Sequence, residues 1–117
     1  MKAILTGLGG RGLYWLGNLR KRDDIEVVGF VEPFQGSIER AVTQHGVARE
    51  TIFASLDEAI KNSDADFVVD VTPPAVHHEV AYKAFENGLH VFGEKPLSDD
   101  FQIAREVAKA GKAANLT

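Results

Sequence analysis

Residues 2–12 read KAILTGLGGRG. The first five residues form a short, mostly apolar stretch that is compatible with a β-strand. The glycines that follow lead into a segment in which leucines recur with helical spacing. A strand, a tight turn and a helix in this order are the context that makes the spacing Gly7-x-Gly9-x-x-Gly12 informative. Gly7 would permit the tight turn, Gly9 would let backbone amides approach a pyrophosphate, and Gly12 would allow close packing of helix on strand. The loop therefore predicts a dinucleotide site.

Two further residues of this loop are candidate contacts for the same ligand. The free N–H groups at the start of a helix face bound phosphates, and Gly10 lies at that point of the loop. Arg11 could add a charge-assisted hydrogen bond to a phosphate. A solvent-facing guanidinium is the equal alternative for Arg11, and the sequence leaves both open.

Strand-like and helix-like segments alternate along the rest of the chain. Apolar runs predict strands at 25–31, 51–54, 67–71 and 89–92, and apolar spacing or capping patterns predict helices at 37–45, 55–62, 76–87 and from about 98 onward. Tyr14 and Trp15 are expected to pack the first helix against a sheet. This alternation predicts an α/β fold, a doubly wound parallel sheet of five strands with helices on both faces. No linker or repeat interrupts it, so we expect one domain over residues 1–117.

The composition excludes several classes of partner. The chain has 117 residues, a formal net charge of −4 and no cysteine. Nucleic acid and anionic membranes call for clustered Lys and Arg, and the negative net charge gives no electrostatic footprint for either partner. The one basic run, at residues 20–22, is expected to be a solvated helix end. Disulfides and thiolate chemistry are excluded, and the apolar run before Gly7 is too short for a signal peptide or a membrane span. We therefore expect a cytoplasmic protein that binds a small molecule.

Glu32 follows the second predicted strand about twenty residues after Gly12. An acidic side chain at this point hydrogen-bonds the adenosine ribose, and its charge repels the 2′-phosphate of NADP. The three residues after Glu32 supply no cation, and Arg40 is the nearest one that follows. The sequence therefore favours NAD, with NADP as the weaker alternative. An ordinary surface carboxylate at the end of a strand is the other interpretation.

Two later segments carry a more specific pattern, TPPAVH at residues 72–77 and GLHVFGEKP at residues 88–96. At this spacing they resemble the amino-terminal domain of the glucose–fructose oxidoreductase, inositol dehydrogenase and rhizopine-catabolism (Gfo/Idh/MocA) family, and the resemblance covers the whole chain. It implies an NAD(P)-dependent dehydrogenase that passes hydride between nicotinamide and a carbon of a sugar, polyol or related hydroxyl compound. It also implies a carboxy-terminal α/β domain with the substrate pocket, an Asp and His pair and homo-oligomer contacts. We therefore expect residues 1–117 alone to bind NAD without turnover.

The resemblance also points to residues near the bound nicotinamide. It assigns Glu94, Lys95 and Pro96 to the cofactor site, with Lys95 as the catalytic residue. Lys95 follows a predicted strand at the edge where doubly wound folds bind ligands, and its ammonium could hydrogen-bond a substrate hydroxyl or stabilise an alkoxide. Pro96 would fix the backbone that aims Lys95. Glu94 either orients Lys95 or forms an ion pair elsewhere.

The first of the two segments adds Thr72, Pro73 and His77 as cofactor contacts. His77 matches the family's motif histidine, although a buried, hydrogen-bonded structural role is equally compatible with the sequence. Pro74 stands where the family usually has asparagine, so any contact of that side chain is absent here or is made by backbone. A metal site is not expected, because adjacent histidines on a helix point about 100° apart.

Two other functional classes stay open at this point. A free-standing NAD-sensing module would need no second domain. An NAD-dependent glycoside hydrolase would use transient hydride transfer to cleave a sugar.

Overall fold

A computed structural model describes all 117 residues and contains one five-stranded sheet with strand order β3-β2-β1-β4-β5. The strands are β1 (Lys2–Thr6), β2 (Glu26–Val31), β3 (Ile52–Phe53), β4 (Phe67–Asp70) and β5 (His90–Gly93). Every pairing is parallel. The prediction of a doubly wound parallel sheet is confirmed. The strand order changes direction between β1 and β4, and in open α/β sheets ligands bind beyond the carboxyl ends of the strands at such a point.

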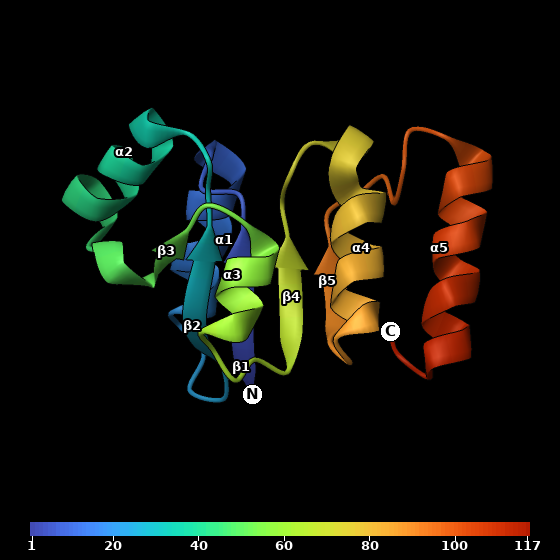
Figure 1. Ribbon diagram of the computed structural model, residues 1–117. Helices are drawn as coiled ribbons and strands as arrows, with labels where there is room; N and C mark the ends of the chain where they lie inside the picture. The colour runs from blue at the N-terminus through green and yellow to red at the C-terminus, as the bar shows by residue number, and fades with distance from the viewer.

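Four α-helices and two short 3₁₀ turns lie between these strands, and a fifth α-helix follows the last strand. They are α1 (Gly10–Leu19), α2 (Gln35–His45), η1 (Arg49–Thr51), α3 (Leu56–Lys61), η2 (Pro74–Val76), α4 (His77–Glu86) and α5 (Phe101–Ala114). Figure 1 shows α3 and α4 on one face of the sheet, α1 on the other, and α5 beside α4 beyond β5. None of these helices is long and apolar enough to cross a membrane.

The sheet separates two hydrophobic cores because successive strand residues point to opposite faces. Leu5 and Val69 belong to the core under α1 and α2, whereas Ile4 and Val68 belong to the core under α3 and α4. All four side chains are almost completely buried. The continuous apolar runs in β1 and β4 thus reflect strands that are covered on both faces.

Local signals set most helix ends as expected. Gly46 ends α2 in the left-handed conformation, and Ser55 caps α3 by accepting a hydrogen bond from the Glu58 N–H. The last helix begins later than predicted, at Phe101, because Asp100 is its N-cap. Residues 98–100 instead form a turn in which the Ser98 hydroxyl accepts a hydrogen bond from the Asp100 N–H.

The two aromatic residues of α1 have different surroundings. Trp15 is half-buried, and its ring packs edge to face on Phe92 of β5 with centroids 5.3 Å apart. Tyr14 is 63% exposed, so the expected packing is wrong for this residue. Neighbouring helix positions point about 100° apart, so of these two aromatic residues only Trp15 faces the sheet.

Candidate functional site

Two glycines of the loop between β1 and α1 are required by the fold itself. Gly7 has a φ of +87°, and a Cβ there would lie 2.9 Å from the Val71 carbonyl oxygen. A Cβ at Gly12 would lie 1.9 Å from the carbonyl oxygen of Gly7. The tight turn and the close packing of α1 therefore explain these two glycines, as the sequence predicted.

Gly9 and Gly10 are not required by the fold. Gly9 has a φ of −64°, which any residue adopts, and a Cβ at either position would meet no atom within 4 Å. The space over the loop is open at the point where α1 begins with free N–H groups. An open backbone at a helix N-terminus fits a pyrophosphate, which has to approach closely and accept hydrogen bonds from these N–H groups.

Glu32 lies at the end of β2 and connects this strand to the glycine loop. Its side chain is buried, with 5% of the residue exposed. Oε2 accepts a hydrogen bond from the Leu8 N–H at 2.7 Å, and Oε1 accepts one from the Phe34 N–H at 3.0 Å. Glu32 is therefore no ordinary surface carboxylate. Each carboxylate oxygen keeps a further lone pair, so a ribose hydroxyl can still donate to it.

Asp70 lies at the carboxyl end of β4, close to the predicted site residues, and the sequence did not predict a role for it. It is 1% exposed. Its Oδ1 accepts hydrogen bonds from the Thr6 hydroxyl at 3.0 Å, the Thr72 N–H at 3.0 Å and the Thr72 hydroxyl at 2.6 Å. These bonds fix the predicted site residue Thr72, and Pro73 follows it as the N-cap of η2. A carboxylate at the end of an apolar strand was the available signal.

His77 joins the two segments that the sequence singled out. It is 3% exposed at the start of α4. Nδ1 lies 2.8 Å from the Pro96 carbonyl oxygen, and Nε2 lies 2.6 Å from the Thr72 carbonyl oxygen. Both ring nitrogens thus lie within hydrogen-bond distance of a backbone carbonyl, and the tautomer decides to which of the two a neutral ring donates. These contacts inside the protein support the structural role for His77.

Glu94 follows β5 and reaches across to α1. Its Oε1 accepts a hydrogen bond from the Trp15 indole at 2.8 Å and forms an ion pair with the Arg11 Nε at 3.0 Å. The bond from Trp15 holds the pKa of Glu94 below its ordinary value; desolvation opposes this effect, and the charges of Arg11 and Lys95 add to it. Of the two interpretations of Glu94, the structure shows the ion pair.

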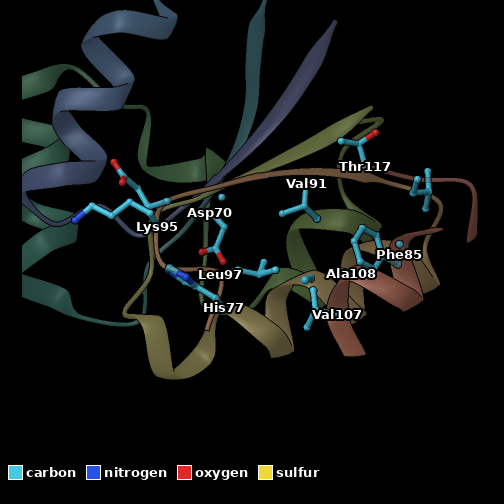
Figure 2. Close-up of a pocket in the computed structure, with 14 residues that line it drawn as sticks. Asp70, His77, Phe85, Val91, Lys95, Leu97, Val107, Ala108 and Thr117 are labelled. Atoms are coloured by element: carbon cyan, nitrogen blue, oxygen red, sulfur yellow. The ribbon is translucent and has the colours of Figure 1, made fainter. Parts of the chain in front are cut away.

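Lys95 is exposed and borders a cavity of about 410 Å³ on the α4 and α5 side of the sheet. Asp70 and His77 lie at the same end of this cavity as Lys95, and its other end is lined by apolar residues such as Phe85 and Val107 (Figure 2). The Lys95 side chain extends away from Asp70. The peptide bond between Lys95 and Pro96 is cis.

The chain matches the oxidoreductase family with an NAD-binding Rossmann fold over residues 1–117. It belongs to the Gfo/Idh/MocA family. The match covers the glycine loop, Glu32 and the Glu94-Lys95-Pro96 segment together. The family resemblance seen in the sequence is confirmed.

Individual Gfo/Idh/MocA relatives agree with this assignment. The chain is 32% identical to inositol 2-dehydrogenase 1 of Paenarthrobacter aurescens over 97% of its length. It is similar in structure to the WlbA dehydrogenase of Chromobacterium violaceum, solved with NADH and UDP-GlcNAcA, with a TM-score of 0.89, 27% identity and 99% of the chain covered. The myo-inositol 2-dehydrogenase of Lactobacillus plantarum gives a TM-score of 0.84 at 30% identity over 97% of the chain. In each comparison the chain spans about one third of the relative's length (33%).

In this Gfo/Idh/MocA chain, most of the predicted residues gather at one edge of the sheet. The glycine loop contacts Glu32 through Leu8, and Arg11 of α1 contacts Glu94. Thr72, His77 and Pro96 form one hydrogen-bonded group beside them. The Lys95 side chain is exposed, and its ammonium forms no ion pair with the neighbouring Glu94, whose carboxylate is held by Arg11 and Trp15.

Proposed function

We propose that residues 1–117 form the dinucleotide-binding domain of a dehydrogenase, with the pyrophosphate held at the glycine loop. The observation that carries this proposal is the open backbone over Gly9 and Gly10, which the fold does not require. These positions lie at the N-terminus of α1, where backbone N–H groups and the helix dipole favour an anion. The family of the chain binds NAD, which supports the same ligand.

NAD is the proposed cofactor in preference to NADP. The buried Glu32 carboxylate is held by backbone N–H groups on both sides, so it has one fixed position at the end of β2. There it would accept a hydrogen bond from a ribose hydroxyl and would repel a 2′-phosphate. Solved relatives bound to NADH and to NAD support a nicotinamide dinucleotide as the ligand. The nearest residues that follow add no cation.

Lys95 is the proposed catalytic residue. A bound nicotinamide supplies the acceptor or donor of hydride. Lys95 would donate a hydrogen bond to the substrate hydroxyl and stabilise negative charge on its oxygen, because an exposed ammonium at this edge is free of competing partners. The other proposed cofactor contacts are Arg11, Thr72, Pro73, His77, Glu94 and Pro96.

The proposed substrate class is a sugar, polyol or related hydroxyl compound. Relatives named as inositol dehydrogenases support this class. The solved WlbA dehydrogenase holds a UDP-sugar acid, so a sugar carrying a nucleotide falls within the same proposal. Assembly of the whole protein into a homo-oligomer and a cytoplasmic location are expectations of the same kind.

The cofactor proposal is tested by titrating NAD⁺ and NADP⁺ into the wild type and Glu32→Ala by calorimetry. We expect the wild type to prefer NAD⁺ and the variant to lose most of that preference. Glu26→Ala is the matched control, because Glu26 lies on the same strand but is exposed. Failure of the wild type to bind either dinucleotide, or an unchanged preference in Glu32→Ala, contradicts the proposal.

A further inference from the structure

The Glu94 side chain connects two parts of the proposed site that are far apart in sequence. Its backbone N–H donates to the Asp70 carbonyl at 2.8 Å, which fixes the loop after β5 to β4. Its carboxylate instead reaches α1, where it meets Arg11 and Trp15. These two residues are four positions apart, so their side chains lie on the same face of the helix, one turn apart. The loop that carries Lys95 is therefore bonded to the helix that begins at the glycine loop.

Trp15 contacts both the strand and the loop that follows it. Its indole N–H donates to Glu94, and its ring packs against Phe92 at an interplanar angle of 77°. Only 19% of the Glu94 side chain is exposed, so this hydrogen bond is partly shielded from water. Loss of the indole N–H would leave a partly buried carboxylate with one partner fewer.

Arg11 can contact Glu94 and a phosphate at the glycine loop at the same time. Glu94 uses its Nε, whereas a guanidinium has five N–H donors. The side chain is 59% exposed and lies in the first turn of α1, beside the open glycine loop. Its terminal N–H groups are thus free to donate to a phosphate while Nε stays with Glu94.

We propose that Arg11, Trp15 and Glu94 form a clamp that aims Lys95 at a nicotinamide dinucleotide bound along α1, with Trp15 as its positioning residue. This inference rests on the proposed function. Trp15 then has a role in the reaction, the positioning of Lys95 through Glu94, in addition to its packing between α1 and the sheet. It also predicts that dinucleotide binding and the surroundings of Lys95 depend on each other.

The clamp itself is tested without any ligand. Trp15 is the single tryptophan of the chain, so its fluorescence reports on the surroundings of this one indole, which include Glu94. Arg11 and Lys95 are the charged groups that act on Glu94. Since the pKa of Glu94 lies below its ordinary value of about 4.3, we expect an acid transition in Trp15 emission below that pH. Glu94→Gln should abolish it, and Glu106→Gln on α5 should retain it. The same transition in Glu94→Gln would overturn the clamp.

The coupling to the dinucleotide is tested by acetylating lysines with and without NADH and measuring each site by mass spectrometry. We expect NADH to protect Lys95 at least threefold in the wild type and in Tyr14→Phe, whose side chain is exposed on the same helix. Trp15→Phe keeps the aromatic packing but removes the N–H donor, so protection of Lys95 should fall to near onefold. Lys21 and Lys109 serve as internal references, and circular dichroism checks folding.

The possible outcomes separate the clamp from the proposed function. NADH binding with full protection of Lys95 in Trp15→Phe overturns the clamp and leaves the function intact. Absence of NADH binding by the wild type removes the function and, with it, the role of Trp15 in aiming Lys95. Should Trp15→Phe fail to fold, Glu94→Ala provides the same comparison, because it removes the acceptor of the indole N–H.

Discussion

A Cβ at Gly12 would lie 1.9 Å from the carbonyl oxygen of Gly7, so the start of α1 packs against the turn that precedes it with no room for a side chain. We expect Gly12→Ala to lower the free energy of unfolding by more than about 3 kcal/mol, because the obstructing atom belongs to the backbone. Gly17→Ala on the same helix meets nothing within 4 Å and should raise it by about 0.5–1 kcal/mol. Chemical denaturation of both variants measures the difference. Equal stability of the two variants would contradict this packing.

Gly9→Ala separates binding from folding at the same loop. A methyl group at Gly9 contacts no protein atom, so thermal stability should stay close to that of the wild type. The methyl group would project into the space proposed for the pyrophosphate, and we expect the dissociation constant for NADH to rise at least tenfold. Calorimetry measures the affinity, and a thermal melt provides the control. Unchanged NADH affinity would place the phosphates elsewhere.

His77→Ala tests the link between the two motif segments. The substitution removes a buried ring and its contacts to the carbonyls of Thr72 and Pro96. We expect a loss of about 2–4 kcal/mol in the free energy of unfolding. His78→Ala is the control, because the buried Nδ1 of His78 has no hydrogen-bond partner to lose. Equal stability of the two variants in urea denaturation would show that the contacts of His77 with Thr72 and Pro96 do not stabilise the fold.

Asp70 should stabilise the carboxyl end of β4 and the segment that follows it, although the sequence predicted no role for this residue. Asp70→Ala leaves two Thr72 donors and the Thr6 hydroxyl without this acceptor, for an expected loss of about 2–4 kcal/mol. Asp70→Asn keeps an oxygen at this point and should lose less. Hydrogen exchange at the Thr72 amide provides a local measurement. Equal exchange rates in Asp70→Ala and the wild type would show that Thr72 is held by other contacts.

Lys95→Met tests the chemistry in the complete protein. Removal of the ammonium should lower kcat by roughly 10²–10⁴-fold, the usual range for a group that assists proton transfer. The dissociation constant for NADH should change much less, because the methionine retains most of the side-chain volume. Lys109→Met on the exposed face of α5 is the control. Wild-type turnover by Lys95→Met would exclude the proposed role.

Much of the architecture was predictable from sequence. Apolar runs and glycine punctuation are local signals, and they placed β1 at residues 2–6 and the end of α2 at Gly46. The failures were local as well. Tyr14 and Trp15 were both assigned to packing on the sheet, although adjacent helix positions face different ways and Tyr14 is exposed. Asp70 was overlooked because an apolar strand indicates burial and says nothing of hydrogen bonds at its last residue.

The sequence alone determined the parallel sheet, the glycine loop and an acidic residue at the end of β2, since each depends on residues close together in the chain. Only the tertiary structure decided which side chains meet at the edge of the sheet. The indole of Trp15 reaches Glu94 across 79 positions of sequence, and His77 joins Thr72 to Pro96. Periodicity specifies which face of an element is buried, whereas strand order and helix packing specify its neighbours. The contacts of Glu94 and Pro96, the two neighbours of Lys95, therefore follow from the strand order β1-β4-β5 and from the position of α1 on one face of the sheet (Figure 1).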